Sequence, residues 1–480
     1  MKRIFLLIML LNFTMACSDF LETEPELQIS IDEQLSTREG VLQAYNGVYR
    51  DIEASFSAFN FVYADALGGN LTFTPSVTQN VVTVPDEIQF EYNFSSTPQN
   101  TTFNSYYENW YDIINQANLL LSNIENFEFF TEDEKNQLRA EMLVTRALSH
   151  YQISLLFAQH YGFSTDASHL GVVYNTDIII AGEDFPSRET MAETYRLIQE
   201  DLDLALALFT NQQLQEGPSY SLFNTLTTSA IYARIALQMS DWQKALDYSS
   251  ISIAQSGQSL MTQENYISEW EKPIDPVSEI ILEFTSPRTS EGDVSSSISA
   301  YFQFNSSSNY GDYVASGDLL NLYAEDDIRG DLFIVQNLNT LNNSILQPQT
   351  YYFTKKFQDD AGTTFMRLSE LYLIRSEANA RLGNTSEALA DLNSIRTRAN
   401  LTELTDINTL LDDIFLERRR ELAFEGFLLF DLARFNKDVE RQDGCIAQVC
   451  DLGYPSNFFI LPIPNDTVEL NQNMQQNEGY

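Results

Sequence analysis

The chain is poor in the residues that most often carry catalysis or bind metal ions. Its 480 residues include 3 histidines, 3 cysteines and 3 tryptophans. The motifs HExxH and GxSxG, a P-loop and a Rossmann glycine pattern do not occur. His150 and His160 are ten residues apart and do not share a helix face, which favours packing over metal binding. We therefore expect no enzyme, no metal site and no cofactor.

Basic residues are also scarce, and this limits the possible partners. The chain has 27 Lys and Arg against 68 Asp and Glu, a formal net charge of −41 at pH 7. Such a charge excludes nucleic acid and an anionic membrane surface as electrostatic partners. It also counts against polyanionic ligands, unless a local basic pocket overrides it. Because 44% of the residues are hydrophobic and 12% aromatic, the acidity does not indicate disorder.

Long apolar runs are missing, and the one short run lies at the N-terminus. Lys2 and Arg3 precede the apolar residues 4–11, and a bilayer span needs about 20. Residues 1–16 are therefore predicted to be a cleaved signal peptide that ends at Ala16. No other segment approaches a membrane span, so the mature chain would be soluble in itself.

The three cysteines are interpreted in the light of this export. Thr14-Met15-Ala16-Cys17 is an acceptable lipoprotein box, so Cys17 is expected to carry a lipid, with residues 17–30 as anchor and tether. The alternative is an ordinary cleavage site beside an incidental thiol. Cys445 and Cys450 then form an even pair that suits a small local disulfide. They lack the second pair that a zinc site needs.

Helical periodicity recurs along the chain. It predicts helices over 37–53, 104–126 and 131–158, the last with a capping box of Thr131 and Glu134. A further helix is expected to begin at Ser187.

Two later segments, 229–255 and 366–399, resemble each other. Each has a helix, a short turn, a capping residue (Asp241 or Asn384) and an Ala-Leu pair in a second helix. This is the tetratricopeptide pattern, in which small residues let paired helices pack closely. We predict an all-α (mainly α) fold, an α-α superhelix of tetratricopeptide-type pairs with long irregular insertions and short β-hairpins.

The insertions, residues 56–103 and 256–350, are rich in Asn, Ser, Thr, Gly and aromatic residues. They include the β-like runs VVTVP and SEIILEFTS. Segments this long are usually functional or disordered, and their aromatic content favours ordered surfaces. Sugars stack their CH faces on aromatic rings and bind amides through their hydroxyls. The candidate ligand residues are therefore Tyr92, Asn93, Phe94, Tyr301, Gln303, Asn305, Tyr310 and Tyr313. The alternative is that half or more of these side chains pack the insertions onto the helices.

Glu417 and Glu421 are the carboxylates that most resemble an acid/base pair, because they share a helix face. Arginines 418–420 lie between them and Arg434 follows. Arginine lowers the pKa of a neighbouring carboxyl group, whereas a general acid needs a raised pKa. A structural ion-pair network is the better interpretation.

Four stretches of the chain resemble the SusD/RagB family, the surface glycan-binding lipoproteins of Bacteroidota. They are CSDFLETEP from Cys17, AEMLVTRALSHYQISLLFAQHYG (140–162), IRTRANL with ERRRELAFEGFLLFDLARF (395–435), and the ending LPIPNDTVELNQNMQQNEGY. The resemblance implies a single SusD-like domain over 31–480, with an N-terminal part of about 31–260 and a RagB/SusD part of about 261–480. The resemblance leaves the ligand residues unassigned, because these vary among family members.

The resemblance also implies a role. Family members are lids on a SusC-like, TonB-dependent outer-membrane transporter; they bind an oligosaccharide, polysaccharide or another nutrient and pass it inward. They are not enzymes. We thus expect a surface-exposed protein of the outer membrane that contacts the membrane through its N-terminal lipid only. The alternatives are the same role for a peptide or other non-sugar nutrient, or a tetratricopeptide-type scaffold that binds proteins.

Acidic residues that follow Cys17 are predicted to direct the protein to the cell surface. Replacing Asp19, Glu22 and Glu24 together by alanine should leave the protein on the inner face of the outer membrane. Protease added to intact cells would then no longer cleave it. Continued cleavage of the triple variant at the parent rate would contradict the prediction.

Overall fold

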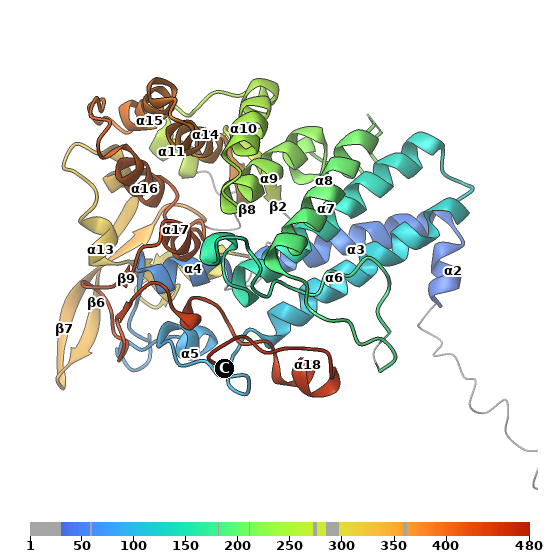
Figure 1. Ribbon diagram of the computed structural model, residues 1–480. Helices are drawn as coiled ribbons and strands as arrows, with labels where there is room; N and C mark the ends of the chain where they lie inside the picture. Colours follow the sequence, from blue (N-terminus) through green and yellow to red (C-terminus); the bar gives the residue numbers. More distant parts are fainter. Residues whose placement is uncertain are drawn as a thin grey trace, which may run out of the picture.

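The computed structural model describes residues 30–57, 60–180, 182–210, 212–271, 276–284, 297–358 and 362–480. The predicted signal peptide, Cys17 and all of the tether but its last residue lie outside these ranges. The described chain is mainly helical, as predicted, with few strands, the longest of which lie at one end (Figure 1). The division into domains stays a prediction.

Helices of the N-terminal half form layers around an aromatic core. They are α2 (Ile31–Leu35), α3 (Arg38–Phe56), α4 (Asn60–Gly68), α5 (Gln89–Tyr92), α6 (Asn104–Asn123), α7 (Glu132–Phe157), α8 (Met191–Leu208), α9 (Thr225–Gln238) and α10 (Trp242–Ser256), with single turns η1 (Asp86–Ile88), η2 (Ile124–Asn126), η3 (Tyr161–Phe163) and η4 (Ser219–Ser221). Trp110 of α6 is buried, with its ring centroid 5.2 Å from that of Phe56. Apolar faces of α3, α6 and α7 meet there, so this tryptophan is a packing residue.

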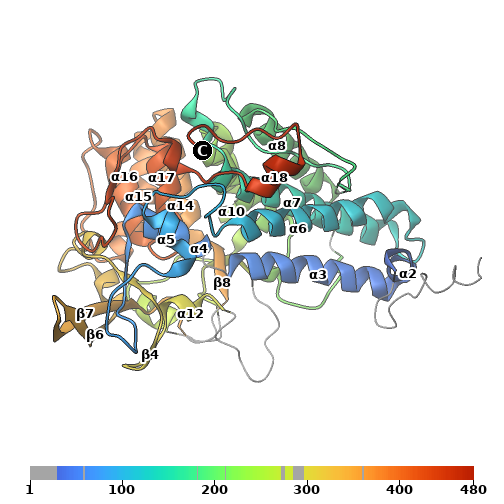
Figure 2. The ribbon, with the colours of Figure 1, turned by 90° about the horizontal axis from the view of Figure 1, so that it is seen from below.

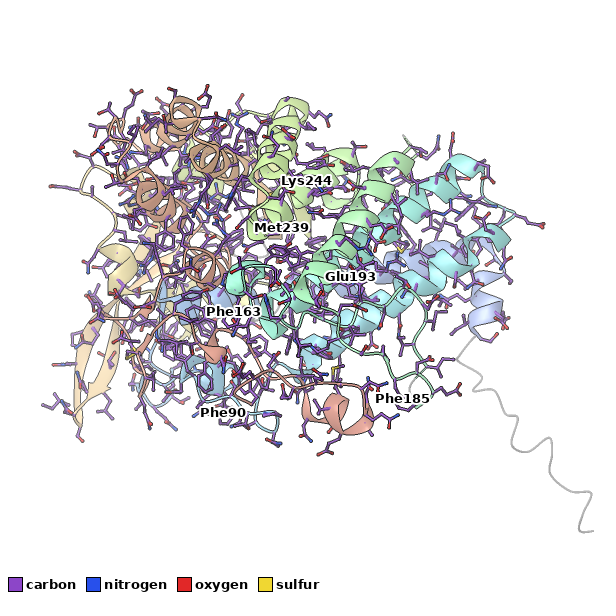
Figure 3. The ribbon with its side chains drawn as sticks, viewed as in Figure 1. Phe90, Phe163, Phe185, Glu193, Met239 and Lys244 are labelled. Atoms are coloured by element: carbon purple, nitrogen blue, oxygen red, sulfur yellow. A yellow bond between two sulfur atoms is a disulfide. The ribbon has the colours of Figure 1, made fainter. Side chains whose placement is uncertain are left out.

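Helices of the C-terminal half join the N-terminal half where α14 packs against α9 and α10. They are α11 (Tyr266–Trp270), α12 (Ser299–Phe302), α13 (Gly317–Leu320), α14 (Leu368–Leu382), α15 (Thr385–Arg398), α16 (Leu410–Glu421), α17 (Leu428–Arg434) and α18 (Asn465–Leu470), with η6 (Ile328–Leu332) and η7 (Asn457–Phe459). The pairs α9–α10 and α14–α15 are the two predicted repeats, and α10 packs against α14. Lys244, labelled in Figure 3, lies on α10. Its ammonium donates to Gln199 of α8 at 2.7 Å.

Strands occur as antiparallel pairs among the described residues: β1 (Leu71–Phe73) with β5 (Tyr313–Ala315), β2 (Ile280–Phe284) with β8 (Thr363–Arg367), β3 (Phe304–Ser306) with β4 (Asn309–Tyr310), β6 (Phe333–Asn342) with β7 (Ile345–Thr354), and β9 (Val439–Glu440) with β10 (Asp451–Leu452). The β6–β7 hairpin is the longest, in continuous register from Phe333↔Thr354 to Asn342↔Ile345. Its turn residues, Asn343 and Ser344, have φ of 50° and 64°, as a type I′ turn requires. The hairpin lies at the end of the molecule opposite α2 (Figures 1 and 2).

Several local predictions are confirmed and two are wrong. The Thr131–Glu134 capping box is present, and Asp241 caps α10 by accepting from Lys244 N. The helix expected at Ser187 begins instead at Met191, with Thr190 as its cap. The preceding residues are extended because Glu189 N donates to Val172 O and Arg188 Nε donates to Gly171 O. The run VVTVP forms only an isolated bridge, between Val82 and Pro75.

Glu141 is a buried carboxyl group in the middle of α7. The hydroxyls of Tyr45 and Tyr49 both donate to its Oε2, and Gln137 Nε2 donates to its Oε1 at 2.7 Å. Burial raises its pKa to about 7, although these three hydrogen bonds oppose the rise. An acid with a raised pKa in the folded state binds protons more tightly there than in the unfolded chain. Its contribution to stability is therefore lost as pH rises from about 4.5 to about 7.

Glu141→Gln should remove this pH dependence. Between about pH 4 and about pH 8, the unfolding free energy of the parent should fall by about 3 kcal/mol relative to that of the variant. Urea titrations of both proteins at several pH values measure the difference. A constant difference across that range would show that the raised pKa is wrong.

Candidate functional site

The two predicted insertions meet at one corner of the fold. Strand β1 pairs with β5, so Phe73 lies opposite Tyr313. Thr74 N donates to Asp312 O at 3.0 Å, and the Tyr310 hydroxyl donates to Pro75 O at 2.8 Å. Segments more than 200 residues apart in sequence therefore build one surface.

The second group of candidate ligand residues surrounds the β3–β4 hairpin on this surface. Tyr301, Gln303 and Tyr310 are half-buried, and Asn305 is exposed. Asn305 Nδ2 donates to Gln303 Oε1 at 2.7 Å, so the two amides form a pair at the rim. The structure thus brings four of the predicted residues together beside partly exposed aromatic rings.

Two other candidate ligand residues are buried. Tyr92 and Tyr313 are both 0% exposed, and Phe73 lies between them, with ring centroids 4.8 and 5.5 Å away. The Tyr313 hydroxyl donates to Glu87 Oε1 at 2.9 Å. Burial and this carboxylate raise the pKa of Tyr313 well above its ordinary value, so the hydroxyl stays protonated. Both rings pack the insertions onto the fold, and neither offers a face to a ligand.

Asn93 and Phe94 lie beside the Cys445–Cys450 loop. These two cysteines are joined by a disulfide, with their Cα atoms 6.0 Å apart. Asn93 Oδ1 accepts from Gln448 N at 3.2 Å, and the guanidinium of Arg441 is 4.8 Å from the Phe94 ring centroid. The buried rings of Tyr92, Phe73 and Tyr313 separate this pair from the β3–β4 group.

The sequence interpretation missed the side chains of the β6–β7 hairpin. Phe353 is buried against Phe304 and Tyr310, with ring centroids 4.9 and 5.9 Å away. The half-buried Tyr351 shares a hydrogen bond of 2.9 Å with the Thr340 hydroxyl. A possible signal was the uninterrupted run of uncharged residues over 333–354.

A buried cluster of ion pairs holds both ends of this hairpin. Arg329, in the turn before β6, lies 2.7 Å from Glu417 and 3.2 Å from Glu421. Lys356, just after β7, lies 2.7 Å from Glu425 and donates to the Glu421 carbonyl. Burial alone would raise the pKa of Glu421, but Arg398, Arg367 and Arg329 hold it well below its ordinary value. These carboxylates have the ion-pair role expected from sequence, and such a depressed pKa does not suit a general acid.

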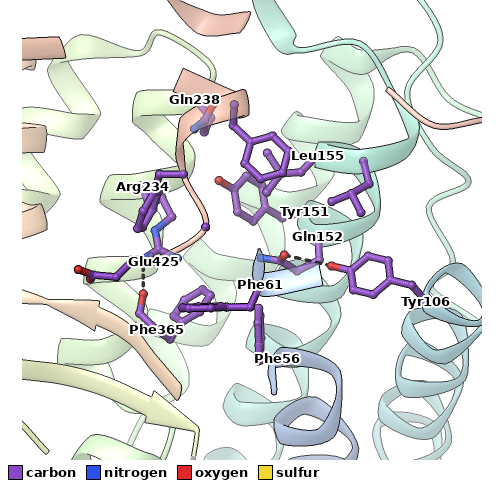
Figure 4. Close-up of a pocket in the computed structure, with 14 residues that line it drawn as sticks. Phe56, Phe61, Tyr106, Tyr151, Gln152, Leu155, Arg234, Gln238, Phe365 and Glu425 are labelled. Atoms are coloured by element: carbon purple, nitrogen blue, oxygen red, sulfur yellow. Dashed lines mark hydrogen bonds between the residues drawn. The ribbon is translucent and has the colours of Figure 1, made fainter. Parts of the chain in front are cut away.

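The cavity among the helices α4, α7 and α9 is too small for a sugar. A cavity of about 50 Å³ lies between α4, α7, α9 and the start of α17, lined by Phe61, Tyr151, Arg234 and Glu425 among others (Figure 4). An engineered cavity that binds benzene measures about 150 Å³, so this cavity is too small for a sugar ring. The candidate site is instead the open surface around β3–β4.

Metal and membrane features are absent from the described ranges. Within residues 30–480, apart from the gaps given above, no group of three or more His, Cys, Asp and Glu side chains could hold a metal ion. In the same ranges, no helix combines the length and apolar character that a bilayer crossing demands. His150 is a satisfied packing residue, because its Nε2 accepts from Asn175 N at 2.9 Å.

The fold is a helical scaffold, and its β3–β4 surface carries half-buried aromatic rings beside amides. Residues 333–480 match the SusD family, and residues 19–237 match a family described as starch-binding and associating with the outer membrane. The chain belongs to the SusD family.

Several similar proteins cover more than nine-tenths of the chain, and one covers a quarter of it. A SusD-like protein of Formosa agariphila is 21% identical over 91% of both chains. The starch-binding protein SusD of Bacteroides thetaiotaomicron is 34% identical, over 25% of this chain and 22% of its own. A SusD superfamily structure from Bacteroides thetaiotaomicron has a TM-score of 0.79 at 25% identity, covering 92% of this chain and 99% of its own. A putative sugar binding protein of Bacteroides vulgatus has a TM-score of 0.77 at 23% identity, covering 92% of this chain and 98% of its own.

Gly311 sets the geometry of the β3–β4 surface, since a Cβ there would overlap the backbone carbonyl of Tyr301. We expect Gly311→Ala to lower the unfolding free energy by about 1–3 kcal/mol through overpacking. Gly330→Ala is the control, because its Cβ would meet no atom within 4 Å. Urea unfolding measures both, and equal midpoints for the two variants would contradict this account of the hairpin.

Proposed function

We propose that the protein binds an oligosaccharide or polysaccharide on the β3–β4 surface. It would be anchored at the cell surface through a lipid on Cys17 and deliver its ligand to a SusC-like, TonB-dependent transporter. Support for the glycan comes from the surface itself and from relatives described as starch-binding. Support for the anchor and the transporter comes from the sequence resemblance.

The position of the Tyr310 ring is the main support for the proposal. Its ring is half-buried, and its hydroxyl donates to Pro75 O at 2.8 Å. That hydrogen bond fixes the ring, so stacking of a sugar on it costs little conformational entropy of the tyrosine side chain. Stacking is worth about 1–3 kcal/mol per ring, by analogy with bases on aromatic side chains.

Amides around the ring supply the polar part of such a site. Gln303 and the exposed Asn305 each have donors and acceptors, and Asn305 is fixed by its hydrogen bond to Gln303. Hydroxyl groups of a sugar need both kinds of partner. Half-buried rings beside oriented amides therefore suit a polyhydroxylated ligand better than an ionic one.

The position of the surface suits a protein held at its N-terminus. Helix α2, the first described helix, lies at the end opposite the hairpins (Figures 1 and 2). An anchor that precedes α2 would leave the β3–β4 surface far from the point of attachment. A long polymer could then reach this surface without obstruction by the anchor.

A peptide is the alternative ligand with some support in the structure. Val335, Leu341, Ile345 and Leu346 of the β6–β7 hairpin are 41–64% exposed. Exposed aliphatic side chains favour a protein or peptide partner. The amides and pinned ring of the β3–β4 surface favour a sugar, and we rank the glycan first.

Tyr310→Ala and Tyr301→Ala test the site directly. Each should weaken glycan binding by about five- to 150-fold, equivalent to the 1–3 kcal/mol of one stacked ring. Tyr372→Ala, at a half-buried tyrosine of α14, is the matched control and should leave affinity unchanged. Titration calorimetry with a cognate glycan measures all three, with thermal unfolding to check folding. Unchanged affinity in both site variants would place the ligand elsewhere.

A further inference from the structure

Charged side chains are missing from one corner of an otherwise highly acidic protein. One residue in five of the chain is charged, yet the segments 66–85, 297–311 and 333–354 contain no Asp, Glu, Lys, Arg or His. They comprise the β1 region, the β3–β4 hairpin and the whole β6–β7 hairpin. We call these three segments together the neutral corner.

These segments are far apart in sequence and meet in space. The Tyr310 hydroxyl reaches Pro75 O, and Leu341 N donates to Asn80 O at 2.6 Å. Phe304 and Tyr310 pack on Phe353 of β7. All three segments that lack charged residues are therefore neighbours in the fold. Because they are far apart in sequence, no local sequence rule explains why all three lack charge.

The absence of acidic residues indicates that this surface becomes covered. Elsewhere the protein keeps itself soluble with exposed carboxylates, and long hairpins normally carry charges on their free edges. Covering a carboxylate without a counter-charge is strongly unfavourable, whereas covering an amide or hydroxyl that gains a hydrogen bond is not. A surface that binds a neutral partner would exclude acids in this way.

The absence of basic residues indicates that an anionic glycan does not cover the neutral corner. Sulfate and carboxylate groups on a glycan are bound through Arg and Lys. Within 60–103 and 297–354 the sequence has one basic residue, Arg329, which is 1% exposed and lies 2.8 Å from Asp327. Lys355, which follows β7, pairs with Glu271 at 2.9 Å. Arg288, Glu291 and Asp293 belong to the segment 285–296, outside the described residues.

Neutral hydrogen-bonding groups are plentiful on the same surface. Its exposed polar side chains include Thr78, Gln79, Asn305, Ser306, Ser307, Ser308, Asn309, Asn337, Asn339 and Thr350. They extend from the β3–β4 rim onto the β6–β7 hairpin and could follow successive sugars of a chain. The rings of Tyr310 and Tyr351, each held by a hydrogen bond of its hydroxyl, lie where the two hairpins pack together.

We infer that the ligand is an electrically neutral glycan and that the β6–β7 hairpin extends its binding surface. This inference rests on the proposed function, because it assumes that a glycan binds at the β3–β4 surface. It adds the chemical class of the ligand and a second binding element. Uronate-bearing and sulfated polymers are excluded as ligands.

The test uses the purified full chain and two sets of polysaccharides. The neutral set contains α-glucan, β-glucan, mannan and xylan, and the anionic set contains alginate, pectin and a sulfated galactan. We expect binding within the neutral set only, with a dissociation constant that does not change between low and high salt, because no ion pairs form. Binding of an anionic polymer with a strong salt dependence would overturn the inference and leave the proposed glycan function standing. Absence of binding to every polymer would reject both.

Substitutions that introduce a positive or a negative charge at one position test both the location of the binding site and the preference for a neutral ligand. Asn305→Lys, Asn305→Asp, Asn339→Lys and Asn339→Asp should each weaken binding of the neutral glycan roughly tenfold, because either charge must be desolvated. Gln243→Lys, on the exposed face of α10, is the control and should have no effect. Tighter binding by the lysine variants alone would indicate an anionic ligand. Unchanged affinity at Asn339 with loss at Asn305 would remove the β6–β7 hairpin from the site.

Discussion

The buried ion pair of Glu421 and Arg367 is the interaction on which the C-terminal half depends. Arg367 lies 2.7 Å from Glu421, 2.6 Å from Glu279 and 2.8 Å from Glu425. Arg367 is the last residue of β8, and its partners come from α16, from the segment before β2 and from the turn after α16. Removing one member of such a cluster leaves an uncompensated buried charge, which costs about 3–5 kcal/mol. The cluster therefore allows one arrangement of these elements and penalises others.

The same cluster positions the surface that we assign to the ligand. Arg329 and Lys356 join the two ends of the β6–β7 hairpin to Glu417, Glu421 and Glu425. A two-stranded hairpin is marginally stable alone, so its position must come from its root and from the packing of its Phe353 on Phe304 and Tyr310. Charge is concentrated at the buried root of the hairpin and excluded from its exposed part. One set of residues gives rigidity, and the other leaves a neutral surface free for a ligand.

Much of the fold could be predicted from sequence because its signals are local. Helical periodicity and the capping residues Thr131 and Asp241 predicted α7 and α10. The start of α8 could not be predicted, because hydrogen bonds of Arg188 and Glu189 to distant backbone keep that segment extended. Tyr92 and Tyr313 looked like surface rings for a similar reason: only the pairing of β1 with β5 shows that they pack against Phe73.

Hydrogen exchange in the presence of a neutral oligosaccharide that binds tests the central claim most directly. The account predicts slower exchange of backbone amides in 74–82, 303–311 and 333–354, and no change in the helix pairs α9–α10 and α14–α15. Protection confined to those helix pairs, with none in the neutral corner, would contradict it.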